Sequence, residues 1–372
     1  MSYKSFKDIL GYEETLFKER RVFDLDYIPE AFIHRDAQMQ SIALCLIPAL
    51  KGGRAMNALI IGPSATGKTT ALKLRFQEIE EESRDVVCVH INCQITHTKF
   101  GVFSHIYRKL LGHTPPETGV PFSRIYEAIF RRLIRDGKSL VVALDDMNYL
   151  FYGRLGNEIL YDILRAHERF PEAKTSIFGI VSDVSMSLNF DPRVNSIFSY
   201  REIFFQPYSM NEIYDILKNR ARLGFFLGVI EDELVEKIAG YAFEHGDLRV
   251  GIELLRVSGI IAEAEASRRI SERHMEKAYG SSKLVNMKLL ISSLSSNEKA
   301  LLRLIADSEE AVSGNIYRKF RETAGVSYTK FYRIVEKLEN LKFIETSQLT
   351  PGRGRSRRIV LKHKKEDILG LL

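Results

Sequence analysis

The chain has 372 residues, of which 45% are hydrophobic and 27% are charged. This balance is typical of a soluble globular protein with two or three domains. The most apolar run, residues 42–50, is much shorter than the roughly 18 residues that a transmembrane helix needs, and early charges argue against a signal peptide. We therefore expect a cytoplasmic protein with no membrane partner.

The net charge of +6 is concentrated at one end of the chain. Residues 287–372 hold 17 Lys and Arg against 10 Asp and Glu, which is a net charge of +7, whereas the remainder has a net charge of −1. Such segregation indicates a polyanionic partner for the C-terminal part. A solvated basic surface is the alternative.

Three cysteines are too few for a disulfide framework. Cys88 and Cys93 lie near His90 in a predicted strand, which raises the question of a metal site. Residues five apart on a strand face opposite sides, however, and no second pair of ligands follows. We expect buried free thiols.

At the N-terminus, residues 1–20 are charged and weakly periodic, and we interpret them as an arm or a first helix. Asp26-Tyr27-Ile28-Pro29-Glu30 follows, and then a helical apolar pattern through residues 42–50. Tyr27 and Ile28 could form an apolar seat for a nucleotide base, although ordinary core packing explains them equally well.

The next element is a predicted strand, residues 58–61, followed by a glycine-rich loop and a helix. The loop matches the phosphate-binding pattern completely, at Gly62, Gly67, Lys68 and Thr69. Backbone N–H groups of such a loop and the helix N-terminus bind a polyphosphate, Lys68 reaches the β/γ-phosphates, and Thr69 can ligate Mg²⁺. The predicted binding residues for ATP or ADP in this segment are Gly62, Pro63, Ser64, Ala65, Thr66, Gly67, Lys68, Thr69 and Thr70.

Two further strands alternate with helices. Residues 86–91 have apolar side chains on both faces, and residues 94–134 form a helical stretch that Pro115, Pro116 and Pro121 divide into pieces. The strand at 139–144 ends in Asp145-Asp146. Asp145 is placed to hold Mg²⁺ through water, and Asp146 to polarise an attacking water. A solvated acidic turn is the alternative for so short a motif.

A fourth strand, residues 176–181, ends at Ser182, and Asp191-Pro192-Arg193-Val194 leads to another strand at 202–205. The alternation of strands and helices predicts a parallel sheet with helices on both faces. Arg193 follows an Asp-Pro turn and could neutralise charge on a γ-phosphate, including that of a neighbouring subunit. An ordinary surface arginine fits equally well.

From Pro207 the pattern is helical only. Ser209 to Glu212 is a capping box that opens a helix. The helix after Gly246-Asp247 carries Arg249 in its first turn, where a cation opposes the helix dipole unless an anion lies nearby. Arg249 is therefore a candidate ligand for a nucleotide phosphate.

The C-terminal part predicts helices near 295–305, 313–323 and 327–338, and strands at 342–346 and 358–361 around a basic loop. This order describes a winged helix-turn-helix, whose third helix would enter the major groove while the wing contacts phosphates or the minor groove. The alternative is a winged helix that contacts proteins. The candidate DNA-binding residues are Tyr328, Thr329, Lys330, Tyr332, Arg333, Arg353, Arg355 and Arg357.

Taken in order, these motifs resemble the archaeal origin-recognition-complex type of replication initiators, which belong to the AAA+ superfamily. The resemblance covers nearly the whole chain. It implies an α/β fold in which an AAA+ P-loop parallel-sheet base with a small helical lid precedes a C-terminal winged-helix domain. The motifs that carry it are Asp26-Tyr27-Ile28-Pro29, the loop 62–69, Asp145-Asp146, Asp191-Pro192-Arg193-Val194-Asn195-Ser196, Pro207-Tyr208, Gly246-Asp247-Leu248-Arg249 and the winged helix.

The resemblance also implies roles and limits. Lys68 and Thr69 would be Walker A, Asp145 and Asp146 Walker B, Arg193 the arginine finger and Arg249 the lid sensor. Residues 94–104 would form the initiator-specific insertion, a second DNA contact. The family binds ATP, often retains ADP, recognises double-stranded origin DNA on the nucleoid, acts with other initiator subunits and helps to recruit the replicative helicase. The implied domains are an arm at 1–20, the base at 21–206, the lid at 207–286 and the winged helix at 287–372.

The chain departs from the family pattern in two places. The family usually has Asp-Glu where this chain has Asp145-Asp146, and usually has Asn where this chain has Ser182. Both changes favour a slow ATPase that acts as a switch, and they argue against a motor or clamp loader, which needs rapid turnover. The rival interpretation is a signalling or regulatory P-loop NTPase whose winged helix contacts proteins.

Overall fold

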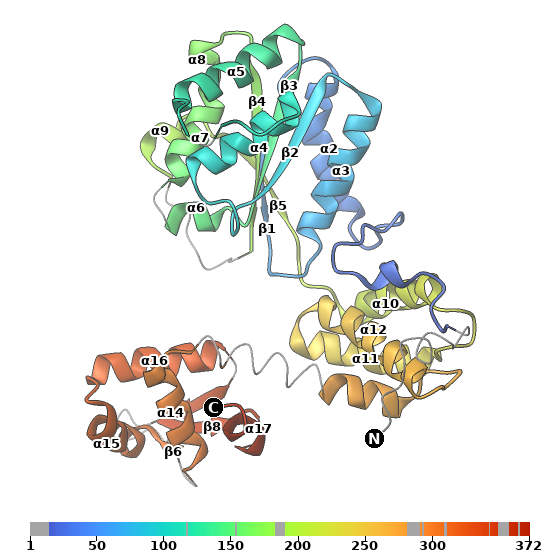
Figure 1. Cartoon of the computed structure of the whole chain (residues 1–372), viewed down its shortest axis with the longest axis vertical. Coiled ribbons are helices and arrows are strands. Elements are labelled where there is room, and N and C mark those ends of the chain that lie inside the picture. The colour runs from blue at the N-terminus through green and yellow to red at the C-terminus, as the bar shows by residue number, and fades with distance from the viewer. Residues whose placement is uncertain are drawn as a thin grey trace. The chain divides into compact units, whose positions relative to one another are not determined.

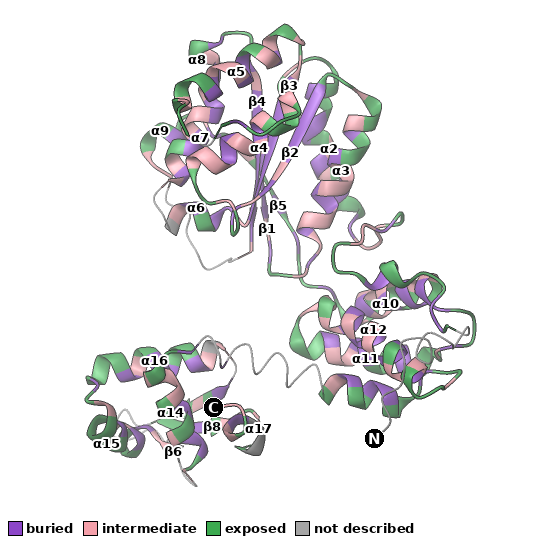
Figure 2. Cartoon of the chain, viewed as in Figure 1, coloured by how far each residue is buried: buried purple, intermediate pink, exposed green. Residues whose placement is uncertain are grey.

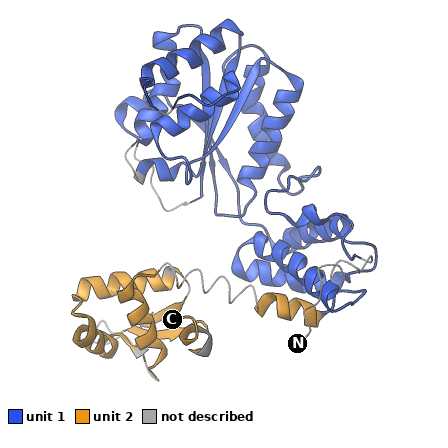
Figure 3. Ribbon diagram, viewed as in Figure 1, with its two compact units in different colours: residues 1–271 blue, residues 272–372 orange. Residues whose placement is uncertain are grey.

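The computed structural model describes residues 15–116, 118–152, 155–182, 190–280, 291, 294–308, 311–341, 343–348, 357–363 and 365–372. The chain divides into two compact units, Met1–Ser271 and Glu272–Leu372 (Figure 3). The predicted base and most of the predicted lid fall in the first unit. The predicted domain limits at 206 and 286 stay predictions.

The first unit is built around a five-stranded sheet in the order β2-β3-β4-β1-β5, in which all paired strands are parallel. The strands are β1 (Asn57–Ile61), β2 (Val86–Asn92), β3 (Ser139–Asp145), β4 (Lys174–Val181) and β5 (Tyr200–Phe204). All five were predicted. Their apolar side chains explain this, because β3 is buried along its entire length and β4 is buried after its first residue (Figure 2).

Helices cover both faces of this sheet, as predicted (Figure 1). Helices α2 (Asp36–Leu50) and α3 (Lys68–Glu82) pack on one face, and α4 (Lys99–Leu111), α5 (Phe122–Arg135) and α7 (Gly156–Leu164) pack on the other. The break between α4 and α5 contains the three prolines that predicted it. The short helices are α6 (Asn148–Tyr152), α8 (Ala166–Arg169) and α9 (Pro192–Asn195).

The cysteines are free and buried, as predicted. Cys88 belongs to the core on the α2 and α3 side, whereas Cys93 belongs to the core on the α4 and α5 side. The two thiols therefore face opposite sides of the sheet. None of the helices in the described part of the chain is long and apolar enough to cross a membrane.

Three helices of the first unit form the predicted lid: α10 (Met210–Gly224), α11 (Asp232–His245) and α12 (Leu248–Ala264). The predicted capping box opens α10, because the Ser209 N–H donates to Glu212 at 2.7 Å and the Glu212 N–H donates to the Ser209 hydroxyl at 3.4 Å. Residues 17–23, which include the 3₁₀ helix η1 (Arg20–Phe23), pack on these helices through Phe17 and Phe23, whose rings contact Phe225. The described end of the predicted arm therefore lies on the lid.

The second unit is the predicted winged helix. Its elements are α14 (Ser296–Ala306), β6 (Ala311–Val312), α15 (Ser313–Ala324), α16 (Tyr328–Asn340), β7 (Ile344–Gln348), β8 (Arg357–Leu361) and α17 (Lys365–Leu369). The strands form an antiparallel sheet in the order β6-β8-β7. β6 and α17 were not predicted, because two and five residues are too short to show a period. The core includes Phe320, Phe331 and Phe343, which are fully buried.

Candidate functional site

The loop between β1 and α3 has a backbone that demands glycine. Gly67 is the N-cap of α3 with φ 90°, in the left-handed region. A Cβ atom there would lie 2.8 Å from the ring of Phe32 and 2.8 Å from the hydroxyl oxygen of Tyr208, and one on Gly62 would collide with the carbonyl oxygen of Phe205. The loop backbone is therefore packed closely against β5 and the segment that precedes the lid.

Lys68 is buried in this loop, with 4% of its surface exposed. Its Nζ donates to the carbonyl oxygens of Gly62 at 2.8 Å and Pro63 at 2.7 Å. Burial lowers the pKa of Lys68 from 10.5 to about 8, although the nearby carboxylates of Asp146 and Asp145 oppose this effect. The loop thus holds a desolvated ammonium group that is still charged at neutral pH.

Asp145, the last residue of β3, faces this lysine and is the centre of a hydrogen-bond network. Its Oδ2 accepts from the Thr69 hydroxyl at 2.8 Å and from His90 Nε2 at 2.9 Å, and its Oδ1 accepts from the Asp146 N–H at 3.1 Å. Burial alone would raise the pKa of Asp145. The hydrogen bond and the charge of His90, together with the hydrogen bonds from Thr69 and the Asp146 N–H, outweigh burial and lower this pKa below its ordinary value. A hydroxyl beside an ionised carboxylate is a donor set that suits Mg²⁺.

Asp146 lies next to this network in a conformation that is uncommon for a residue with a side chain, φ 51°. The hydroxyl of Ser182, just after β4, donates to Asp146 Oδ1 at 2.8 Å. The ends of two neighbouring parallel strands therefore bring the predicted pair together, where ligands commonly bind in such sheets.

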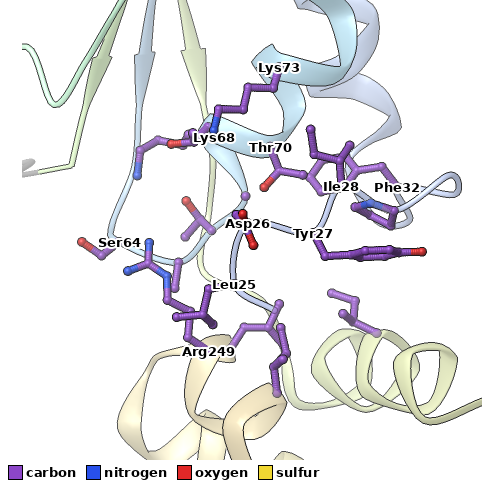
Figure 4. A pocket seen from close by; sticks show the side chains of 18 of the residues that line it. Leu25, Asp26, Tyr27, Ile28, Phe32, Ser64, Lys68, Thr70, Lys73 and Arg249 are labelled. Atoms are coloured by element: carbon purple, nitrogen blue, oxygen red, sulfur yellow. The ribbon is translucent and has the colours of Figure 1, made fainter. Parts of the chain in front are cut away.

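A pocket of about 470 Å³ connects these groups. One wall is the loop with Asp145, Asp146 and Ser182; the others are residues 25–33 and side chains of α10 and α12. The predicted residues that line it are Tyr27, Ile28, Ser64, Ala65, Thr66, Gly67, Lys68, Thr69, Thr70, Asp145, Asp146, Ser182 and Arg249. Figure 4 shows Arg249 reaching from the lid toward the loop, on the side of Ser64, with Tyr27, Ile28 and Phe32 on the opposite side.

Arg193 does not line this pocket. It lies on α9 with 71% of its side chain exposed, and its guanidinium donates to Asp191 Oδ2 at 2.9 Å. The carboxylate of Asp191 also caps α9, because it accepts the Val194 N–H at 2.8 Å. Arg193 is therefore fixed at the surface, as its Asp-Pro turn predicts, and outside this pocket of its own chain.

Residues 94–104, the predicted insertion, comprise the turn after β2 and the first half of α4. Ile95 in this turn is 78% exposed, which is unusual for a large apolar side chain. Gln94 Nε2 donates to the Tyr149 hydroxyl at 2.8 Å, so the turn is attached to α6, which begins two residues after Asp146.

The candidate DNA-binding face of the second unit is on α16. Its buried side consists of Phe331, Ile334, Val335 and Leu338, as predicted. Tyr328 is 50% exposed, and Thr329, Lys330 and Arg333 are exposed as well. Tyr332 is only half-buried on this face, because its ring packs against Tyr328 at 4.7 Å and against Phe331 at 5.3 Å.

The three arginines predicted for the wing divide into two groups. Arg357 begins β8, is exposed, and its N–H donates to the Ser313 hydroxyl at 2.9 Å. Arg353 and Arg355 lie outside the described residues. Their role stays a prediction from the sequence.

Known proteins share this combination of elements. A family model described as the Cdc6 AAA+ ATPase-type lid domain matches residues 214–280. The chain is 48% identical over 367 residues to ORC1-type DNA replication protein 2 of Methanothermobacter thermautotrophicus, which covers 98% of this chain and 97% of that one. The chain belongs to the ORC1-type DNA replication proteins.

Solved structures agree with this assignment. The ORC1-type protein is similar to the Aeropyrum pernix ORC1 protein in a structure with DNA, with a TM-score of 0.77 and 28% identity, over 96% of this chain and 97% of that one. It is also similar to the Aeropyrum pernix ORC2 protein in ADPNP–ADP complexes, with a TM-score of 0.64 and 25% identity, over 96% and 97% of the two chains. The resemblance noted in the sequence, and the fold that it implied, are therefore confirmed.

Sequence reasoning missed three polar side chains that organise the pocket of this ORC1-type protein. His90 was considered only as a neighbour of cysteines, yet it binds Asp145. The register of β2 and β3, which pairs Asn92 with Asp145, places the two residues at the same end of adjacent strands. The position of both residues near the C-terminal ends of two predicted strands was the sequence feature that could have revealed this contact.

The other two are buried arginines. Arg35, 4% exposed, donates to the carbonyl oxygens of Thr66 at 3.1 Å and Gln206 at 2.7 Å, and its guanidinium lies 3.7 Å from the centre of the Tyr208 ring. Arg220, 9% exposed, donates to the Val22 carbonyl at 2.6 Å and lies 4.6 Å from the ring of Tyr27. Nothing in the sequence pairs residues so far apart.

Proposed function

We propose that this ORC1-type protein is a nucleotide-controlled replication initiator. It binds ATP or ADP with Mg²⁺ in the pocket between the glycine loop and the lid, and it recognises double-stranded origin DNA through the winged helix and the insertion at 94–104. The observation that carries the proposal is the buried, charged Lys68, which lies in a glycine loop beside the pair formed by Thr69 and Asp145.

In this proposal each wall of the pocket has a task. Loop N–H groups and Lys68 bind the phosphates, Thr69 ligates Mg²⁺, and Asp145 holds its water ligands. The apolar surface of Tyr27 and Ile28 receives the base, and Arg249 contacts a phosphate from the lid. Bound Mg²⁺ supplies charge neutralisation at the phosphate oxygens.

Nucleotide can control conformation because the pocket has walls from two parts of the first unit. The loop belongs to the sheet, whereas Arg249 and Ile252 belong to a lid helix. A ligand that contacts both favours the arrangement in which both contacts form, by an amount equal to its difference in affinity for the two states. ATP and ADP differ in the γ-phosphate, and therefore in what they offer Arg249.

Hydrolysis is proposed to be slow. The carboxylate of Asp146 already accepts the Ser182 hydroxyl, and its side chain is one methylene shorter than that of glutamate. A water that it polarises would lie farther back in the pocket. Arg193, exposed on α9, would act as an arginine finger on the γ-phosphate of a neighbouring subunit.

The DNA contact is proposed on three grounds. The exposed face of α16 presents Tyr328, Thr329, Lys330, Tyr332 and Arg333, residues 287–372 carry a net charge of +7, and the sequence of the wing supplies Arg353, Arg355 and Arg357. The similar Aeropyrum pernix ORC1 protein was solved in complex with DNA. We also propose the replicative helicase and other initiator subunits as partners, and a place on the nucleoid in the cytoplasm.

The test is a nuclease footprint of the full-length protein, with ATP and with ADP, on a candidate origin from its own genome and on a scrambled duplex of equal length. Protection of discrete sites in the origin alone, with a difference between ATP and ADP, is expected. Lys68→Ala should abolish the nucleotide difference and retain salt-dependent DNA binding. Weak, uniform protection of both duplexes would refute the initiator role and favour a regulatory NTPase.

A further inference from the structure

His90 makes a contact that its neighbours in sequence do not predict. It lies on β2, and its Nε2 is 2.9 Å from Asp145 Oδ2, the same oxygen that accepts the Thr69 hydroxyl. Asp145 is only 5% exposed. The imidazole is therefore hydrogen-bonded directly to the carboxylate that is proposed to hold the water ligands of the metal ion.

We propose that His90 is a positioning residue for the metal site: it holds the Asp145 carboxylate in the orientation in which that group and the Thr69 hydroxyl together bind Mg²⁺ with a nucleotide. This inference rests on the proposed function. Partners of this kind, behind the groups that hold a metal ion, commonly contribute 10- to 100-fold to metal affinity.

The hydrogen bonds around Asp145 support this role. The Asp146 N–H binds Oδ1, and both Thr69 and His90 bind Oδ2, so all three known partners of the carboxylate are donors. An ionised carboxylate accepts only, and His90 must therefore donate the Nε2 hydrogen. Thr69 can keep its hydrogen bond while an oxygen lone pair ligates the ion, and the carboxylate keeps lone pairs for the ion's waters.

Strand pairing also fixes where His90 lies. β2 and β3 are paired in parallel, with His90 opposite Ala143 and Asn92 opposite Asp145. The strand pairing fixes the backbone of His90 relative to that of Asp145. Thr69, in contrast, lies at the start of α3, next to the loop that a nucleotide contacts. Without His90, the Asp145 carboxylate loses its only donor from β2 among the described residues and keeps the Thr69 hydroxyl on α3 and the Asp146 N–H.

The surroundings of His90 allow this idea to be tested by substitution. Its side chain is 22% exposed and lines a second, open hollow together with Lys73, Cys88 and His105. A smaller residue at position 90 would enlarge that open hollow and would not leave an enclosed cavity in the core. The variants should therefore fold.

The experiment measures the affinity of the full-length protein for a fluorescent ADP analogue, in Mg²⁺ and in EDTA. In the wild type, Mg²⁺ should increase the affinity. His90→Ala should reduce that gain by about 10-fold or more and leave the affinity in EDTA unchanged. His90→Gln should keep most of the gain, because the glutamine Nε2 reaches about as far as the histidine Nε2. His105→Ala, at the other imidazole of the hollow, should behave as the wild type.

Each other result has a defined meaning. Equal losses in Mg²⁺ and in EDTA for His90→Ala would show a merely structural role and overturn the inference, as would an unchanged gain, or a loss in His90→Gln as large as in His90→Ala. A wild type that binds the analogue equally well in both conditions would instead refute the proposed metal site, and the inference would fall with it.

Discussion

Lys68→Met should make the protein more stable while it destroys nucleotide binding. Methionine has nearly the length of the lysine stem and carries no charge. The lysine is 4% exposed, and burial lowers its pKa from 10.5 to about 8. The fold therefore bears a cost for keeping this ammonium charged, and the substitution removes that cost.

The magnitude follows from the two pKa values. A fall from 10.5 to about 8 corresponds to about 3 kcal/mol, at roughly 1.4 kcal/mol for each pKa unit. Because the folded pKa of a base is lowered, this cost is fully present below about pH 8 and disappears as the pH rises toward 10.5. The loss of the hydrogen bonds to Gly62 and Pro63 takes back about 1 kcal/mol each, so at pH 7 the net gain is about 1 kcal/mol.

The assay is a thermal melt of protein stripped of nucleotide, at pH 7, with and without ADP and Mg²⁺. Without nucleotide, Lys68→Met should melt about 1 to 2 °C higher than the wild type. At a nucleotide concentration of about 100 times Kd, the wild type should gain about 2.7 kcal/mol and the variant nothing, so the order should reverse. Lys73→Met, the same exchange at a half-buried position of α3, should change stability by less than about 0.5 kcal/mol. A variant that is less stable than the wild type without nucleotide would refute the reasoning.

Three further predictions concern the same proposals. Nucleotide affinity should fall as the pH rises above about 8, by up to about tenfold per pH unit, because phosphate binds the protonated Lys68 and binding above this pH takes up a proton. Calorimetry in buffers of different ionisation enthalpy would detect that proton. Its absence would count against Lys68 as the titrating group. Asp146→Glu should raise ATP turnover by about tenfold or more at unchanged affinity, because the longer side chain reaches the water, and an unchanged single-turnover rate would argue that Asp146 does not polarise it. Arg355→Ala should weaken binding to every duplex and reduce the slope of log K against log salt by about one, as measured by anisotropy at several salt concentrations, whereas an unchanged slope would remove the wing from the interface.

The fold was predictable where local pattern and physics agree. Strands β1 to β4 are mostly buried apolar runs because helices cover both faces of the sheet, whereas the edge strand β5 keeps Arg201 and Glu202 exposed. The loop 62–69 needs glycine at two fixed positions for steric reasons. Gly67 adopts φ 90°, and a side chain at Gly62 would collide with Phe205. The conformation of this loop is therefore predictable from one short stretch of sequence.

The contacts that complete the pocket could not be predicted in this way. Arg35 binds carbonyl oxygens of residues 66 and 206, and His90 binds Asp145 from another strand. In each case the partner is a backbone oxygen or a carboxylate distant in sequence. An arginine or a histidine can have many roles, so the residue type alone does not identify the partner. Arg193 shows the reverse: its turn was predictable, but the structure places it outside the pocket of its own chain, so a second subunit is needed for its proposed role.

The two buried arginines connect the segment that contains Tyr27, the proposed seat for the base, to both sides of the pocket. Arg220, on the lid helix α10, holds the backbone at Val22 and stacks on Tyr27, whereas Arg35 holds the carbonyl of Thr66 in the phosphate loop. Tyr27 therefore lies on a segment whose start is attached to the lid and whose end is attached to the loop. Because guanidinium groups that are buried with carbonyl partners are costly to separate, a rotation of the lid must carry this segment with it or break those bonds. A base seated against Tyr27 would resist such a rotation even without a γ-phosphate, so ADP alone should restrict the lid and ATP should add only the contact with Arg249.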